Sequence, residues 1–171
     1  MAALRDPAGL DDLLLYRLSR LQSAGGSMVI RLCEGRFGIT WREWRVIAWL
    51  AQENDLLSSQ LAERIRLDRA RTSRAVSSLV TKKLVRRQTG TSDRRQARLA
   101  LTERGRALHG DLFPLVCEIN RGLLSVLPAQ DVRRLDHMLT SMQQQADGMV
   151  EAAELPKADR RRGARGRLAP D

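Results

Sequence analysis

The chain has 171 residues, of which 43% are hydrophobic and only 4% aromatic, and its formal net charge is +10. This composition fits one domain with a substantial core and favours aliphatic helix packing over a β-sandwich. The first residues show no basic-then-apolar leader, and no apolar run approaches the ~18 residues that a membrane span needs. We therefore expect a mostly helical, cytoplasmic and nucleoid-associated protein with no membrane partner.

Two helices are predicted in the first third of the chain. Apolar residues recur at helical spacing over residues 11–36, where the pair Gly25-Gly26 is expected to loosen the helix. Thr40 is a suitable N-cap for a second helix over residues 41–52. One apolar face of this second helix is expected to consist of Trp44, Ile47, Ala48 and Ala51.

The next segment has the outline of a helix-turn-helix. Ser58 opens a short helix that ends near Ile65, and Asp68 is placed to cap another helix over residues 69–83. Because so few residues separate the two helices, they are expected to meet through a tight turn.

The helix predicted over residues 69–83 has two different faces. At 100° per residue, one side gathers the residues expected in the core, Thr72, Ala75, Val76 and Leu79. The opposite side, which Arg71 flanks, gathers the small and basic residues Ala70, Ser73, Arg74, Ser77 and Thr81. Small side chains let a helix enter the major groove of DNA, where Arg reaches guanine or phosphate. An ordinary solvated helix would instead mix Glu with Lys, but no acidic residue follows Asp68 in this helix.

A short hairpin is predicted directly after this helix. Residues 84–88 and 97–101 read as two strands, and Thr-Gly and Ser-Asp pairs supply turn chemistry between them. Such a hairpin is a wing whose tip, with Arg94 and Arg95, is suited to the negative potential of the minor groove. Asp93 is placed to hold one of these arginines through a charge-assisted pair.

The basic charge of the chain is concentrated in the same region. Residues 64–106 hold 14 basic and three acidic residues, a net charge of +11, so the rest of the chain is nearly neutral. Such a block is an electrostatic footprint for a polyanion, because each neutralised phosphate releases a condensed counterion. An arginine-rich solvated surface is the alternative that charge alone leaves open.

The remainder of the chain is predicted to serve assembly. Thr102 caps a helix that runs to Leu127, in which Pro114 is expected to introduce a kink, and Pro128 starts a last helix. Both helices carry apolar stripes that one small lobe cannot cover, so a partner chain is expected. Residues 151–171 lack helical apolar spacing and read as a disordered tail.

The sequence lacks the patterns of catalytic and metal-binding sites. Its two histidines, His109 and His137, lie in different helical segments, and neither a catalytic motif nor a Cys/His set for zinc occurs. Cys33 and Cys117 lie far apart and form neither a disulfide framework nor a metal-ligand cluster. We therefore expect no enzymatic activity, no metal and no cofactor.

Residues 67–105, together with the segment "ITWREWRVIAWLAQEN", resemble the MarR (multiple antibiotic resistance regulator) family of winged helix-turn-helix proteins. The resemblance covers about residues 10–150, and the wing signature D-x-R-x5-L-T falls without a gap on Asp93, Arg95, Leu101 and Thr102. It implies a fold that is mostly α with a small β-hairpin wing, in which a winged helix-turn-helix lobe is joined to long terminal dimerisation helices. It also implies a homodimer on a palindromic operator in double-stranded DNA. Lys83 departs from the family, which usually has Gly there to allow a left-handed helix C-cap.

This resemblance assigns a role to each part of the chain. The expected regions are an N-terminal dimerisation helix at 10–38, a winged helix-turn-helix DNA-binding region at 39–102, C-terminal dimerisation helices at 103–150 and a basic disordered tail at 151–171. The residues predicted to contact DNA are Ser58, Arg69, Arg71, Ser73, Arg74, Ser77, Asp93, Arg94 and Arg95.

Three hypotheses remain for the biological role of DNA binding by this protein. Because family members commonly bind small aromatic or phenolic anions, the first is a repressor released by such an effector, in a pocket formed by Arg17, Arg20, Trp41 and Trp44. The second is a regulator of the same fold with a thiol redox switch at Cys33 or Cys117. The third is a non-specific architectural protein that packs DNA without regulating a particular gene.

Overall fold

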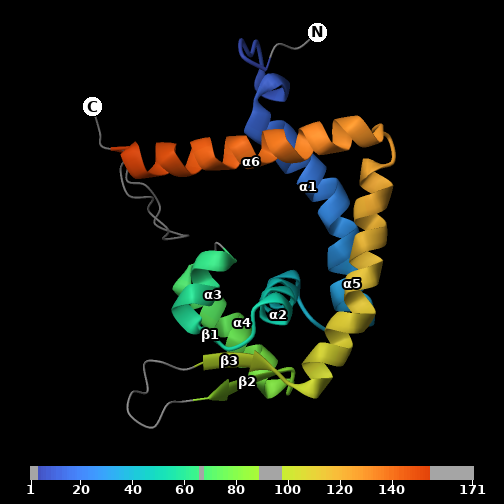
Figure 1. The fold of residues 1–171 in the computed structure, drawn as a ribbon, viewed down its shortest axis with the longest axis vertical. Helices are drawn as coiled ribbons and strands as arrows, with labels where there is room; N and C mark the ends of the chain where they lie inside the picture. The colour runs from blue at the N-terminus through green and yellow to red at the C-terminus, as the bar shows by residue number, and fades with distance from the viewer. Residues whose placement is uncertain (1–3, 66–67, 89–97, 155–171) are drawn as a thin grey trace, which may run out of the picture. The chain divides into compact units, whose positions relative to one another are not determined.

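The computed structural model describes residues 4–65, 68–88 and 98–154. Its described elements are six α-helices, three short strands and two short turns of 3₁₀ and π helix (Figure 1). The chain divides into two compact units, Met1–Val126 and Leu127–Asp171. The predicted fold class, mostly helical with a small β-hairpin, is confirmed.

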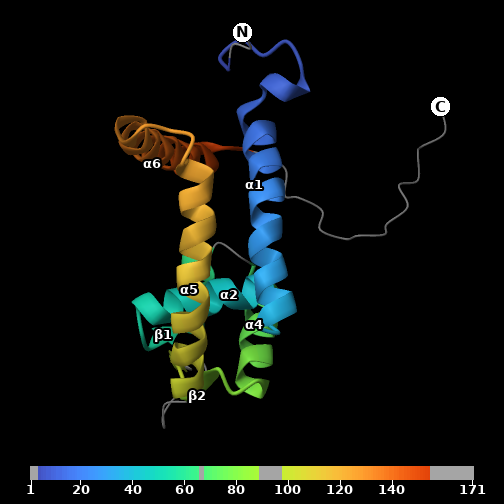
Figure 2. The same cartoon turned by 90° about the vertical axis from the view of Figure 1, so that its right-hand side faces the viewer.

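The N-terminal helical segment is less regular than one helix over 11–36. It consists of a 3₁₀ turn η1 (Leu10–Asp12), helix α1 (Leu14–Arg31) and a π-helical turn η2 (Leu32–Arg36). The expected loosening at Gly25-Gly26 is wrong, because both residues lie within regular α1. A Cβ at Gly25 would stand 3.1 Å from Cδ1 of Leu123 in helix α5 (Glu103–Leu124). The missing side chain instead lets α1 and α5 pack side by side (Figure 2).

Helix α2 (Trp41–Gln52) lies at the centre of the core. It starts as predicted, since Thr40 Oγ1 accepts a hydrogen bond from the Glu43 amide at 3.2 Å and the Glu43 carboxylate accepts one from the Thr40 amide at 2.6 Å. The predicted apolar face is wrong in part, because Ala51 is exposed. Since α2 packs against both α4 and α5, its buried arc is wider and comprises Glu43, Trp44, Val46, Ile47 and Leu50.

The predicted helix-turn-helix is present as α3 (Ser58–Arg64) and α4 (Arg69–Thr81). Ser58 is the first residue of α3 rather than its cap, and Leu57 donates its amide to Gln60 Oε1 at 2.9 Å. Asp68 caps α4 as predicted by accepting the Arg71 amide at 2.8 Å. The four residues expected on the inner face of α4 are all buried: Thr72, Ala75, Val76 and Leu79.

The predicted hairpin strands are confirmed as β2 (Val85–Gln88) and β3 (Arg98–Leu101), which pair antiparallel with Val85 opposite Leu101. A third strand, β1 (Leu56–Leu57), was not predicted, and it pairs with β3 to give the order β1-β3-β2. Two residues are too short to show the alternation that marks a strand in a sequence, so β1 is defined only by its partner.

Helix α5 starts as predicted, because Thr102 Oγ1 accepts the Gly105 amide at 3.0 Å, and Pro114 lies inside it. Helix α6 (Ala129–Ala152) belongs to the second unit, begins after Pro128 and has no buried residue. It extends into the segment predicted to be a disordered tail, whose residues 155–171 lie outside the described ranges. Within those ranges no single helix is long and apolar enough to cross a membrane, although α5 and α6 taken together across their break reach that length and composition.

Candidate nucleic-acid interface

The outer face of α4 is open to solvent. Helices α2 and α3 and strand β2 pack against α4 and cover its inner side. All residues predicted on the opposite side are exposed: Ala70, Ser73, Arg74, Ser77 and Thr81, with Arg71 beside them. We call this set the reading face. Its side chains are short except for the two arginines, so the helix presents a narrow surface with basic groups.

A hollow of about 310 Å³ lies where α3, α4 and β2 meet. It is lined by Ser58, Ser59, Arg69, Thr72, Ser73, Val76 and Arg87. Three predicted site residues, Ser58, Arg69 and Ser73, are therefore brought together here. Hydroxyl and guanidinium groups donate hydrogen bonds, so the hollow suits phosphate oxygens.

Arg87 completes this hollow, although it is not among the site residues predicted from the sequence. The signal was present in the two-residue period of the strand. Val85 is buried, and side chains two residues apart on a strand point to the same face, so Arg87 lies on the side of β2 that meets α4. Arg86 points to the other side and interacts electrostatically with Glu103.

The arginines of this lobe differ in whether an acidic group already holds them. Arg71 pairs with Asp68 at 3.1 Å and Arg98 pairs with Asp55 at 3.3 Å. By contrast, Arg69, Arg74 and Arg87 form no ion pair with any residue in the described ranges. These three guanidinium groups, unpaired within the described ranges, thus lie on the reading face and around the hollow.

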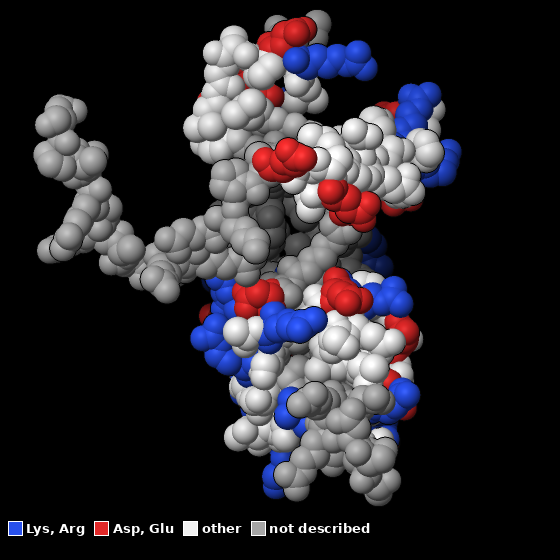
Figure 3. Space-filling model, turned by 90° about the vertical axis from the view of Figure 1, so that its left-hand side faces the viewer, with Lys and Arg blue, Asp and Glu red and all other residues white. Residues whose placement is uncertain are grey.

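One further contact holds this surface in place. Arg45 of α2 donates a hydrogen bond to the Ile65 carbonyl, which holds the C-terminal end of α3. Figure 3 shows the lobe from the left-hand side of Figure 1, with Lys and Arg side chains spread over it and some acidic side chains between them. The wing residues predicted to contact DNA, Asp93, Arg94 and Arg95, lie outside the described residues.

Among the hollows lined by described residues, the one that contains Arg17 and Arg20 contains neither Trp41 nor Trp44, the other two residues predicted to form an effector pocket. Trp44 is only 4% exposed and stacks on His109 with ring centroids 5.6 Å apart, and Trp41 packs against the same core. Arg17 and Arg20 lie exposed on α1, where a shallow hollow is lined by Arg17, Arg20, Leu21 and Ala24. Arg20 also pairs with Asp11 at 2.8 Å. The tryptophans therefore belong to the core of the lobe and the arginines to a helix surface.

The two cysteines have different environments. Cys33 is fully buried, and this burial together with the nearby charge of Glu34 raises the pKa of its thiol to about 11. Cys117 is half-buried in α5. The described residues contain no group of His, Cys, Asp and Glu side chains that could hold a metal ion. Because its pKa is raised, the Cys33 side chain stays a thiol, the form that reacts poorly with oxidants.

Comparison with known proteins gives the same picture of the lobe. Residues 37–96 match the model described as "MarR family". The fold is similar to a MarR/EmrR family transcriptional regulator from Acinetobacter sp. ADP1, with 24% identity, a TM-score of 0.75 and coverage of 82% of this chain and 99% of that one. It is also similar to the PcaV transcriptional regulator of Streptomyces coelicolor in complex with its natural ligand, with 23% identity, a TM-score of 0.69 and coverage of 82% and 99%. A MarR transcriptional regulator from Methanosarcina mazei Go1 matches at 24% identity with a TM-score of 0.69, covering 78% and 98%.

Proposed function

This chain belongs to the MarR family of winged helix-turn-helix proteins, and from that premise we propose that it is a sequence-specific DNA-binding transcriptional regulator. In this proposal the reading face of α4 enters the major groove, where Arg74 contacts a base edge while Ser73 and Ser77 allow close approach. The observation that carries the proposal is the guanidinium group of Arg74, which lies on an exposed helix face without acidic residues and forms no ion pair with a residue that the structure describes.

The hollow between α3, α4 and β2 is proposed to hold a DNA phosphate. Arg69 and Arg87 supply charge and the Ser58 and Ser73 hydroxyls supply further hydrogen bonds. Contacts of this kind fix the register of a protein on DNA without reading sequence. Arg94 and Arg95 are proposed to enter the adjacent minor groove, with Asp93 holding one of them.

The protein is proposed to act as a homodimer on a palindromic operator. Apolar side chains on α1 are exposed, among them Leu15 at 78% and Leu21 at 59%, and α6 exposes a row that includes Met138, Leu139 and Met142. Exposed apolar surface of this extent favours a partner chain. The regions 10–38 and 103–150 are accordingly proposed as dimerisation helices.

We propose repression relieved by a small aromatic acid as the regulatory mode. The cationic groups of Arg17 and Arg20 offer a site for a carboxylate, and Trp41, half-buried in the same unit, is available as an aromatic partner after a local rearrangement. The thiol alternative is less well supported at Cys33, because burial keeps that group protonated.

The decisive experiment is selection of duplexes from a random-sequence pool by the full chain, followed by footprinting. A regulator is expected to enrich one inverted repeat whose half-sites lie about one helical turn apart, roughly 34–36 Å. Equal affinity for the selected duplex and for a scrambled duplex of the same composition would instead identify an architectural packing protein. Release of the selected duplex by benzoate-like acids, set against release by an oxidant, separates effector sensing from redox sensing.

A further inference from the structure

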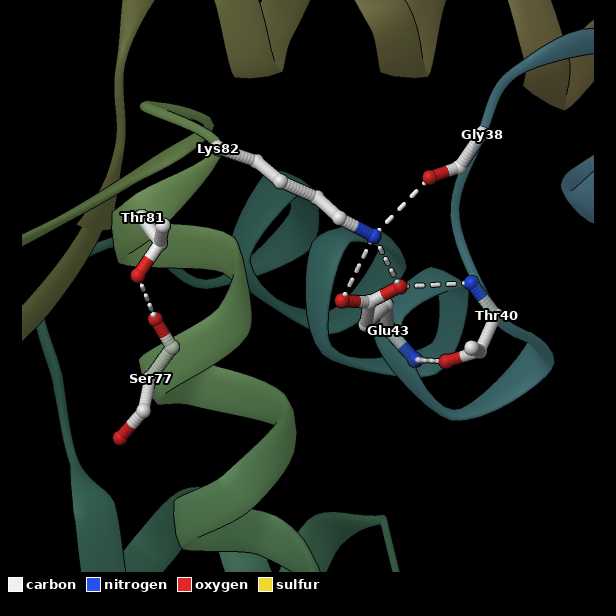
Figure 4. A network of polar contacts seen from close by, with 6 residues as sticks. All are labelled: Gly38, Thr40, Glu43, Ser77, Thr81 and Lys82. Carbon is white, nitrogen blue, oxygen red and sulfur yellow. Dashed lines mark hydrogen bonds and ion pairs between the residues drawn. The ribbon is translucent and has the colours of Figure 1, made fainter.

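The C-terminal end of α4 is tied to the junction between α1 and α2. Lys82 Nζ lies 3.0 and 2.9 Å from the two carboxylate oxygens of Glu43 and donates a third hydrogen bond to the Gly38 carbonyl at 2.9 Å (Figure 4). Gly38 has a left-handed backbone, with φ of +63°, and joins η2 to the start of α2. One ammonium group therefore holds together elements that are 39 and 44 residues apart in the sequence.

The carboxylate of Glu43 is unusual because it is buried, with a side chain that is only 3% exposed. Burying a carboxylate is costly unless hydrogen bonds and an opposite charge compensate. Burial alone would raise the pKa of Glu43, but hydrogen bonds from Lys82, Ser78 and Thr40 hold it below its ordinary value. The carboxylate is thus ionised at neutral pH, and two of these three donors, Lys82 and Ser78, belong to the last turn of α4 and its cap.

The same end of α4 is fastened a second time, to the start of α5. Thr102 Oγ1 donates towards the Lys83 and Leu84 carbonyls at 2.8 and 3.2 Å, and the Thr102 amide donates to the Leu84 carbonyl at 3.1 Å. The loop between η2 and α2, the first turn of α2 and the start of α5 are therefore all hydrogen-bonded to the C-terminal end of α4. The reading face takes no part in these connections.

From this arrangement we propose that Glu43 and Lys82 are a positioning pair that sets the direction in which α4 presents its reading face. Glu43 then determines DNA specificity without touching DNA, because it fixes Lys82, and through Lys82 the end of α4, against the α1–α2 junction. The inference rests on the proposed function, since it assumes that α4 reads bases.

The change Glu43→Gln distinguishes a general electrostatic effect on DNA binding from a positioning effect, because the two predict different results. Removing a buried negative charge makes the protein more basic, so general electrostatics predicts tighter binding to every DNA. If the pair positions α4, the ratio of the affinity for the selected duplex to that for the scrambled duplex is instead expected to fall, by about tenfold. The ratio is measured by fluorescence anisotropy on both duplexes, with circular dichroism confirming that the variant is folded.

Lys82→Met and Lys83→Met form a matched pair, because both remove one positive charge from adjacent positions. Lys82→Met is expected to lower the affinity ratio, whereas Lys83→Met is expected to weaken binding to both duplexes by the same factor. Lys82→Met also leaves the buried Glu43 carboxylate without its cationic partner, which is expected to destabilise the fold. The effect of the variant on stability must therefore be separated from its effect on DNA binding. The double variant Glu43→Gln/Lys82→Met removes the unpaired buried charge, so it is expected to melt at a higher temperature than Lys82→Met. Its ratio of affinities for the selected and scrambled duplexes is expected to stay low.

Each other outcome contradicts the inference in a recognisable way. If the ratio returns with the melting temperature in the double variant, the pair only keeps the lobe folded. If Glu43→Gln tightens binding to both duplexes equally, the pair does not position α4. If the wild-type chain shows no preference for any selected duplex, the proposed function fails and the inference fails with it, whereas the first two outcomes overturn the inference alone.

Discussion

The reading face and the C-terminal end of α4 use basic residues in opposite ways. On the reading face, Arg74 is exposed and forms no ion pair with a described residue. At the C-terminal end, Lys82 holds a buried carboxylate and a backbone carbonyl. The two residues belong to the same basic block of the sequence, so their neighbours rather than their charge decide whether they are available to DNA. Changes at the fastened end should therefore alter stability first, and changes on the reading face should alter binding alone.

The largest effect is expected for Gly105→Ala, at the junction of α4 and α5. A Cβ at Gly105 would stand 2.1 Å from the Leu84 carbonyl oxygen, which is backbone and cannot move aside without shifting the end of α4. Overpacking of this kind is expected to lower the free energy of unfolding by about 3 kcal/mol. Urea unfolding followed by circular dichroism measures this loss.

Gly110→Ala is the matched control for this change, because Gly110 lies in the same helix and a Cβ there meets nothing within 4 Å. Replacing an exposed helical Gly by Ala is expected to stabilise the protein by up to about 1 kcal/mol. Equal effects of the two substitutions would show that α5 does not approach Leu84 as closely as the structure indicates.

The second largest effect is expected for Glu43→Gln, and it should depend on pH. The folded-state pKa of Glu43 lies below its ordinary value of 4.5, so the ionised carboxylate stabilises the fold above that pH. This contribution is lost as the pH falls through the folded-state pKa. The variant should therefore be less stable by about 2 kcal/mol at neutral pH, with a difference that shrinks below about pH 4.5.

Unfolding of the wild type and of Glu43→Gln, compared between neutral pH and about pH 3, tests this prediction. A difference in the free energy of unfolding that stays constant over the whole range would mean that the Glu43 charge adds nothing to stability. In that case the fastened end of α4 would owe its stability to packing and to the contacts of Thr102.

These contacts also show what could be predicted from the sequence. The caps at Thr40, Asp68 and Thr102 and the two faces of α4 were predicted correctly, because they depend on side chains within one or two helical turns. The pairing of Glu43 with Lys82 was not, since it joins residues 39 positions apart that have no shared local pattern.

The predictions for the candidate site also differ between local features and contacts across the fold. Exposure of the reading face followed from helical periodicity, but the hollow that joins Ser58, Arg69 and Arg87 depends on how three elements meet. The expected grouping of Trp44 with Arg17 also required tertiary information, and the structure instead stacks Trp44 on His109 inside the core. Local patterns therefore predicted faces and ends of helices, while partners across the fold could not be predicted.

On the reading face, Arg74→Ala is expected to weaken binding to the selected duplex by about 1.5 kcal/mol, roughly tenfold, with a smaller loss on scrambled DNA. Stability should change by no more than about 0.5 kcal/mol, because the side chain is exposed and unpaired within the described residues. Arg121→Ala in α5 removes the same charge from another exposed position and serves as the control. Equal losses on both duplexes would assign Arg74 to phosphate contact rather than base reading.

The smallest effect, and the one of opposite sign, is expected for Lys83→Gly at the fastened end. Lys83 has a left-handed backbone with φ of +59°, and the amides of Lys83 and Leu84 donate to the Val80 and Leu79 carbonyls at 3.0 and 2.9 Å, which is the hydrogen-bond pattern of a Schellman cap. A residue with a Cβ is strained by about 1–2 kcal/mol in this conformation, whereas Gly is not, although Gly loses more entropy on folding. The net expectation is a gain of about 0.5–1 kcal/mol in the free energy of unfolding. Lys83→Ala removes the same charge but keeps the Cβ, so it should show no such gain; if both variants were equally stabilised, relief of charge repulsion in this basic block, and not the backbone of the cap, would be the cause.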